Sequence, residues 1–418
     1  MRYELFFLSL IDNIGLYILS LLVSIAIYYP IIKRTVLSII DPMFYALSSC
    51  CLANSAAIFL FLINEMSAGF FLHLICSEIC FWMGYFFIKN RRVYFSDYQL
   101  DDKNIARSLF YIFLSLMILG NIITYYLIGI PLLMSSRLEV YSSGGGIGAL
   151  SYITNFSTFY CCIYVFIFIS NKKYFIAIFS LISILIFSIL SGSKSGILVL
   201  LYSYFFYRFF YLKQKFNTKQ IIKYIPLIVA FPIIILLMKY DGDFLKSTIG
   251  LAQRIVAYGD CYWFAYPNNV IENVHIESPF KYLFSPFLGP LRIIDYSEVD
   301  KNLGLQLISL VYDYESSWGP NSRLSVLNWC LFKWYGLIMC LLLGVFVGYF
   351  TTRIINILPH SIISVIIYGF IYTKIMTIIT DPIYGLSHII PIIMFLFIIW
   401  FIFIITGHRF IILKKIRT

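Results

Sequence analysis

The chain has 418 residues, of which 61% are hydrophobic and 12% are charged, and its mean hydropathy is +0.88. Soluble domains carry roughly 25% charged residues, so this composition excludes a soluble fold and predicts an all-α, polytopic integral membrane protein. The formal net charge of +11 does not indicate a nucleic-acid partner, because much of the basic charge falls in short clusters between apolar runs.

Eleven apolar stretches approach or exceed the ~20 residues that a helix needs to cross the hydrocarbon core. We therefore expect about eleven transmembrane helices, within a range of ten to twelve. The basic clusters all fall on one side if the N-terminus is outside and the C-terminus is cytoplasmic, which satisfies the positive-inside rule. The predicted spans are 9–31, 42–63, 68–88, 108–129, 150–170, 174–190, 196–212, 224–239, 330–351, 361–380 and 388–406.

One long hydrophilic segment, 240–329, interrupts the apolar runs and contains ten of the 20 acidic residues. The chain therefore divides into the first eight spans (1–239), a large outer loop (240–329), and three spans with a cytoplasmic tail (330–418). A smaller outer loop is expected at 130–149. Because a polar connection this long is usually a working part, we expect functional residues at the outer face.

Arg137 precedes a glycine-rich stretch in the smaller outer loop, in which Gly144, Gly145, Gly146 and Gly148 fall within five residues. Glycines let a ligand approach main-chain N–H groups closely, and an arginine can fork onto a phosphate. We interpret Arg137 as a substrate-binding residue. The alternative is a flexible turn with Arg137 in the lipid headgroup layer.

A second cation, Lys194, lies at the tip of the small-residue turn 191–196 between two predicted spans. The turn lacks the G-x-x-x-x-G-K spacing of a P-loop and no strand precedes it, so a nucleotide site is not expected. Contact with a substrate phosphate or a lipid headgroup is the functional interpretation of Lys194.

Within 240–329, Arg254, Tyr258, Asp260 and Trp263 lie close together in the sequence. Aromatic rings stack against the apolar faces of sugars and arginine suits phosphate, so Arg254, Tyr258 and Trp263 are predicted to bind substrate. A partly desolvated Asp260 would serve as a general base. The alternative for Asp260 is a loop carboxylate that pairs with Arg254.

Glu315 and Arg323 lie just before the ninth predicted span. Asn321 or Ser322 is expected to cap the helix that follows, and a helix N-terminus favours an anion. Arg323 is therefore predicted to bind a substrate phosphate, and Glu315 is the second candidate for a catalytic carboxylate.

No cofactor and no metal are expected. Asp241 and Asp243 resemble a paired-aspartate metal site, but such pairs are common in loops, and this loop faces away from nucleotide sugars. Two ionisable residues, Glu78 and Lys374, lie within predicted spans, where charged groups are costly and usually functional or paired. An ion pair between Glu78 and Lys374 is one hypothesis for them.

The overall pattern resembles the Wzy family, the O-antigen or oligosaccharide repeat-unit polymerases of bacteria. The features that carry the resemblance are the many spans, the Arg-x10-Gly stretch from Arg137 to Gly148, the small-residue turn with Lys194, and one large outer loop. Asn328 followed by Gly344 is similar to the family's asparagine-then-glycine run after that loop. The resemblance covers roughly residues 40–405. Lys194 stands where many members have arginine, and no second Arg-x9-Gly or Arg-x10-Gly stretch follows Arg254.

This resemblance implies an inverting glycosyltransferase at the periplasmic face of the bacterial inner membrane, which joins undecaprenyl-diphosphate-linked repeat units in O-antigen or surface-polysaccharide synthesis. Arg137, Arg254 and Arg323 would bind the diphosphate, and Asp260 or Glu315 would act as the base. Besides the lipid bilayer, the implied partner is a chain-length regulator of the Wzz type. An O-antigen ligase and a lipid-linked oligosaccharide flippase or transporter are the alternatives.

Overall fold

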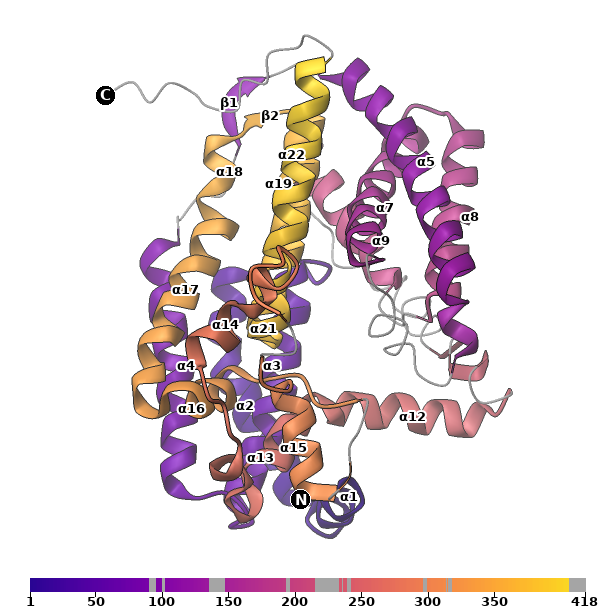
Figure 1. Cartoon of the computed structure of the whole chain (residues 1–418). Coiled ribbons are helices and arrows are strands. Elements are labelled where there is room, and N and C mark those ends of the chain that lie inside the picture. The colour runs from indigo at the N-terminus through magenta and orange to yellow at the C-terminus, as the bar shows by residue number, and fades with distance from the viewer. Residues whose placement is uncertain are drawn as a thin grey trace.

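The computed structural model describes residues 1–89, 95–99, 102–134, 147–192, 196–214, 233–234, 236–238, 242–295, 299–312, 314 and 318–405. This part of the chain is almost entirely helical, so the predicted all-α class is confirmed (Figure 1). Within it, the two short strands β1 (Ser96–Gln99) and β2 (Pro359–His360) pair in parallel.

The helices follow the chain in three groups. Before the segment 240–329 they are α1 (Tyr3–Asp12), α2 (Ile14–Thr35), α3 (Pro42–Leu62), α4 (Ala68–Ile88), α5 (Lys103–Ile128), η1 (Pro131–Leu133), α7 (Ile147–Ser170), α8 (Tyr174–Leu190), α9 (Gly196–Phe205) and the π-helical η2 (Phe206–Tyr211). The segment 240–329 holds α12 (Phe244–Val256), η3 (Ala257–Gly259), α13 (Asp260–Ala265), η4 (Pro267–Asn273), α14 (Pro279–Leu288) and α15 (Leu303–Tyr312). The last group is α16 (Leu324–Phe332), η6 (Lys333–Tyr335), α17 (Gly336–Thr352), α18 (Ile354–Ile357), α19 (Ile362–Ile375), α20 (Thr377–Thr380), α21 (Pro382–Ser387) and α22 (Ile389–Ile405). Because α16 begins at Leu324, the boundary expected after residue 329 falls inside a helix.

Eight stretches of the described residues form helices that are long and apolar enough to cross a membrane. They are Ile14–Thr35, Pro42–Leu62, Ala68–Ile88, Lys103–Leu133, Gly148–Ser170, Leu324–Ile357, Ile362–Thr380 and Pro382–Ile404. The multi-pass membrane assignment is therefore confirmed, whereas the count of eleven is not. Of the other predicted spans, 174–190 forms the 17-residue α8, 196–212 forms α9 and η2, and 224–239 lies mostly outside the described residues.

Helices α4 and α17 pack with their backbones in direct contact. A Cβ added to Gly84 would overlap the carbonyl of Leu341 in α17, and one added to Gly344 would overlap the carbonyl of Phe81 in α4. Small residues permit this close approach, and close packing is what drives association between helices surrounded by lipid. The contact therefore fixes the position of α4, which carries Glu78.

Helix α19 is buried along almost its whole length. Asp102, just before α5, caps it, because its two carboxylate oxygens accept the backbone N–H groups of Ile362 (3.1 Å) and Ile363 (2.7 Å). Near the other end of α19, Tyr372 donates to Asp41, the N-cap of α3 (2.9 Å). These contacts tie both halves of the chain into one bundle.

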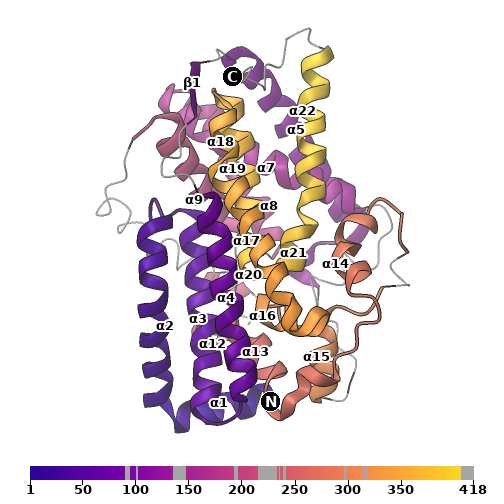
Figure 2. The same cartoon turned by 90° about the vertical axis from the view of Figure 1, so that its left-hand side faces the viewer.

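The segment 240–329 does not lie only on the surface of the bundle. Its first helix, α12, runs across the direction of α5 and α22 and leaves Phe244 and Leu245 64% and 69% exposed (Figure 1). The next helix, α13, is buried from Cys261 to Ala265 and packs on α3, where Gly259 approaches Ala56. Both views place α13 close to α1 and the N-terminus (Figures 1 and 2). A stretch predicted to be a hydrophilic loop thus enters the helical bundle.

Candidate functional site

The centre of the candidate site is Arg323, which directly precedes α16 and is 3% exposed. Its Nε and Nη2 groups donate to the carbonyl oxygen of Tyr258, at 3.1 and 2.5 Å. Its Nη1 group faces the Cys50 thiol at 3.9 Å. Among the described residues the guanidinium forms no ion pair with a carboxylate. A buried cation without a paired carboxylate favours the binding of an anion.

The backbone next to Arg323 is held by the turn between the last two spans. Ser322 donates its hydroxyl to Asp381 (2.8 Å), and Asp381 also accepts the backbone N–H of Tyr384 as the N-cap of α21. The prediction that Asn321 or Ser322 caps the following helix is wrong, because Arg323 is the N-cap of α16 and no side chain caps that helix. Ser322 instead anchors the segment to α21, which sets where Arg323 enters the bundle.

Asp260 begins α13 near Arg323 and is partly buried. Burial raises the pKa of its carboxyl group to about 7, against the opposing effect of the positive charges of Arg323 and Arg254. One carboxyl oxygen accepts the backbone N–H of Cys261 at 2.8 Å. Burial likewise raises the pKa of Asp381. A carboxyl group with a pKa near neutrality can both accept and return a proton at physiological pH.

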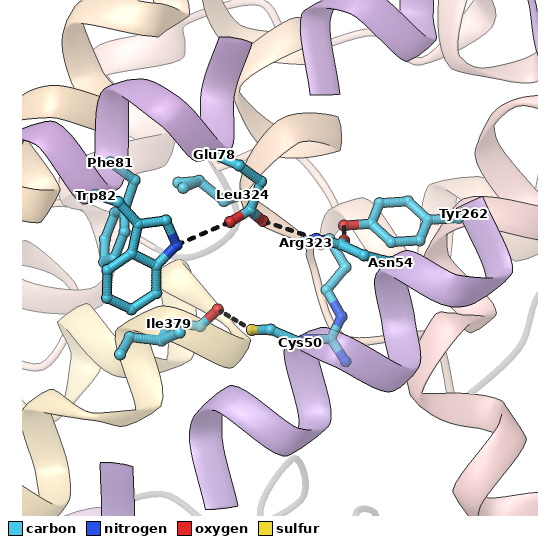
Figure 3. A pocket seen from close by; sticks show the side chains of 9 residues that line it. All are labelled: Cys50, Asn54, Glu78, Phe81, Trp82, Tyr262, Arg323, Leu324 and Ile379. Atoms are coloured by element: carbon cyan, nitrogen blue, oxygen red, sulfur yellow. Dashed lines mark hydrogen bonds between the residues drawn. The ribbon is translucent and has the colours of Figure 1, made fainter. Parts of the chain in front are cut away.

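A second carboxyl group, that of Glu78, is held by donors from α2, α3 and α4. Its Oε2 accepts hydrogen bonds from the Tyr28 hydroxyl (3.0 Å) and the Trp82 indole (3.2 Å), and its Oε1 accepts one from the Asn54 amide (3.2 Å). The Asn54 carbonyl oxygen accepts the hydroxyl of Tyr262 in α13 (2.9 Å; Figure 3). This network connects a carboxylate inside a span with α13 of the segment 240–329.

Glu78 and Arg323 line the same small cavity (Figure 3). Its volume is about 10 Å³, which is room for one water molecule and far too little for a sugar. The residues that line it are Cys50, Asn54, Glu78, Phe81, Trp82, Tyr262, Arg323, Leu324 and Ile379. Polar side chains from the membrane spans and from the segment 240–329 therefore meet around one water-sized space.

The structure brings three of the predicted site residues together: Asp260, Arg323 and Tyr258. Tyr258 contributes its backbone carbonyl to Arg323, while its hydroxyl is hydrogen-bonded to the hydroxyl of Tyr45 at 2.6 Å. Arg254 lies on an exposed side of α12, within electrostatic reach of Asp260. In the described structure Arg254 and Asp260 form no ion pair, so they do not make the surface pair that was the alternative interpretation.

Trp263 occupies a different place from the predicted sugar-binding one. Its ring is 0% exposed and stacks on Phe6 of α1, with ring centres 4.0 Å apart. The N-terminal ammonium group of Met1 donates to the Trp263 carbonyl oxygen at 2.7 Å. Because protein covers the ring, no face is open to a sugar in this structure, and Trp263 instead holds α13 against α1.

The remaining candidates divide into those the structure describes and those it does not. Three predicted site residues lie outside the described residues, namely Arg137, Lys194 and Glu315. The hypothesis of a Glu78–Lys374 ion pair is wrong, since Glu78 is held by the three donors above. The Nζ of Lys374 lies 5.6 Å from the centre of the Phe370 ring.

Several residues of the site were not predicted, among them Tyr28, Asn54 and Asp381. Asn54 is a single amide within an apolar run, and Asp381 lies in a short turn, so neither forms a pattern in the sequence. The one available signal was Glu78, an acidic residue in a span, because a carboxylate there needs donors. Nothing in the sequence says which residues supply those donors.

No protein-family model, curated protein or solved structure matches this chain. The chemistry of the site combines a carboxyl group of near-neutral pKa (Asp260), a buried cation without an ion pair among the described residues (Arg323), and a carboxylate inside a membrane span (Glu78).

Proposed function

We propose that this chain is a Wzy-type polymerase, which joins undecaprenyl-diphosphate-linked repeat units at the periplasmic face of the bacterial inner membrane. The observation that carries the proposal is the proximity of Asp260, whose pKa is about 7, to the buried guanidinium of Arg323. Glycosyl transfer from a diphosphate needs a base and a cation for the leaving group. The resemblance carried by Arg137 and Gly148 supports the same reaction. A Wzz-type chain-length regulator would be its protein partner.

In the proposed reaction a sugar hydroxyl of the new repeat unit gives its proton to the Asp260 carboxylate, and its oxygen attacks the anomeric carbon of the growing chain. The bond between that carbon and the diphosphate oxygen breaks, and the lipid diphosphate leaves with the electron pair. The configuration at the carbon is inverted, and Asp260 releases the proton to solvent. Arg323 stabilises the negative charge on the leaving oxygen, with Arg137, Lys194 and Arg254 as further cations. Glu315 is the alternative base.

The polyprenyl substrate would approach along α12, the helix that leads to Tyr258 and Asp260. The cavity beside Arg323 has room for one water, so the sugars would bind outside it. Helix α12 combines a basic residue, Lys246, with an exposed apolar face, which suits a lipid headgroup and its tail. The exposed apolar residues of α12 are Phe244, Leu245, Ile249 and Ile255.

A reconstituted assay tests the proposal. The full-length protein in liposomes is given a synthetic undecaprenyl-diphosphate-linked oligosaccharide, and a ladder of longer products is expected. Asp260→Asn and Arg323→Gln should each lower the rate by about 100-fold or more, the scale that a general base or a charge-stabilising donor contributes. Lys173→Gln, which removes an exposed cation just before α8, is the matched control and should keep the ladder.

The two possible failures of this assay have different meanings. A ladder of normal length and rate from both Asp260→Asn and Arg323→Gln would exclude these residues from the site, although the polymerase assignment would stand. Absence of a ladder from the correctly inserted wild type would exclude the polymerase itself. Arg137→Ala tests the glycine-rich loop in the same way.

Two other functions share parts of this chemistry. An O-antigen ligase uses the same lipid-diphosphate donor, and a flippase would use charged groups within the membrane. Glu78, a carboxylate in a span that lines a cavity, is the observation that favours the flippase. Gene deletion separates the three: loss of a polymerase leaves lipid A-core with one repeat unit, loss of a ligase leaves polymer on the carrier lipid, and loss of a flippase leaves neither.

A further inference from the structure

Glu78 and Arg323 line one cavity without touching each other (Figure 3). The Glu78 carboxylate has roughly four acceptor positions, and three hydrogen bonds from protein donors occupy it. The Nη1 group of Arg323 has the Cys50 thiol at 3.9 Å, which is a weak acceptor at a long distance. The carboxylate and the guanidinium therefore both retain hydrogen-bonding capacity for a further partner.

The cavity has the size and the lining that a buried water requires. Its volume of about 10 Å³ is close to the space of one water, and such waters make two to four hydrogen bonds to polar groups. Glu78, Arg323, Asn54 and Tyr262 supply the polar groups of the lining. These groups can donate and accept the hydrogen bonds that such a water makes.

We propose that Glu78 is a positioning residue for Arg323: one buried water joins its carboxylate to Nη1 of the guanidinium and fixes the direction of the remaining donors. A second connection runs through the protein, from Glu78 to Asn54 and from Asn54 to Tyr262 in α13. This connection holds α13, which follows Tyr258 in the chain. The carbonyl oxygen of Tyr258 accepts two hydrogen bonds from the Arg323 guanidinium. This inference concerns the arrangement of charges and does not depend on the proposed glycosyl transfer.

A double-mutant cycle on thermal stability tests the link without an activity assay. The full-length wild type, Glu78→Gln, Arg323→Gln and the double variant are compared by apparent melting temperature in one detergent. Because both changes remove the same interaction, the double variant should lose clearly less than the sum of the single losses. The matched control combines Glu78→Gln with Lys246→Gln, whose losses should add. Additive losses for Glu78 and Arg323 would overturn the proposal.

Trp82 supplies a spectroscopic readout of the same link. Its indole N–H donates to Glu78, so the vibrational band that reports indole hydrogen bonding follows the state of this carboxylate. The band is isolated as the difference between the wild type and Trp82→Phe. We expect Arg323→Gln to shift it, because Glu78 loses its counter-charge and its bridging water, whereas Lys246→Gln should leave it unchanged.

A role for Arg323 that is confined to its contact with the Tyr258 carbonyl predicts no shift of the Trp82 band, and that result would refute the link. Should Arg323→Gln not accumulate in the membrane, Arg323→Lys replaces it in the same measurement. Lysine keeps the positive charge, but its single ammonium group cannot donate to the Tyr258 carbonyl and to the water at the same time as the planar guanidinium does. A shift of the Trp82 band is therefore still expected. An unchanged band in Arg323→Lys would then count equally against the proposal.

Discussion

Helices α12 and α13 are neighbours in the sequence but lie in opposite environments. Helix α12 exposes apolar side chains such as Phe244, whereas α13 is buried from Cys261 to Ala265. An aspartate stands at the start of each: the backbone N–H of Lys246 lowers the pKa of Asp243, and burial raises the pKa of Asp260 to about 7. The difference teaches that the average polarity of 240–329 conceals a short apolar helix that enters the bundle.

The largest expected difference between the two helices concerns their aromatic residues. Trp263→Ala should destabilise the protein by about 3–5 kcal/mol, because it empties a fully buried site that stacks on Phe6. Phe244→Ala, on the exposed face of α12, should change stability by less than about 0.5 kcal/mol. Unfolding in the same detergent measures both. Equal losses would show that α12 is as firmly packed as α13.

The next difference is a dependence on pH. The folded-state pKa of Asp260, about 7, lies above the unfolded value of 3.8, so the folded protein binds more protons between these values. Stability should therefore fall as pH rises from about 4 to about 7 and then stay level as far as this group is concerned. Asp260→Asn should remove this fall from a profile of melting temperature against pH.

Asp243 of α12 is the matched control for that profile. Its pKa is lowered, so its contribution is present above 3.8 and is lost only as pH falls through the still lower folded value. Asp243→Asn should leave the slope between about pH 4 and pH 7 unchanged. Parallel profiles for the wild type and Asp260→Asn would mean that this carboxyl group is not buried as described.

The smallest expected effect concerns two tyrosine hydroxyls. Tyr262→Phe should cost about 1–2 kcal/mol, because it leaves the buried carbonyl oxygen of Asn54 without its donor. Tyr258→Phe should cost less, since its hydroxyl bonds to Tyr45 at an exposed position where water can take over. Unfolding measurements on the two variants compare them directly. A larger loss for Tyr258→Phe would show that the Asn54–Tyr262 hydrogen bond contributes less to stability than the Tyr45–Tyr258 one.

Several helices could be predicted closely, because their ends are set by local chemistry. The predicted spans 42–63 and 68–88 correspond to α3 and α4. Asp41 caps α3 and Ser67 caps α4 by accepting backbone N–H groups of the first turn, so short-range signals mark where these helices begin. The interior of 240–329 could not be predicted in this way, because its average polarity hides the buried helix α13.

The sequence by itself determined the membrane class, the helical fold, and the candidacy of Asp260 and Arg323, since hydropathy and isolated charges are properties of local sequence. Only the tertiary structure decided that Trp263 lies in the core and that Glu78 takes its donors from three helices instead of pairing with Lys374. The physical reason is that burial and hydrogen bonding between distant segments depend on which helices pack together. Which helices pack together is decided by steric fit between their surfaces, such as the close backbone contact of α4 with α17.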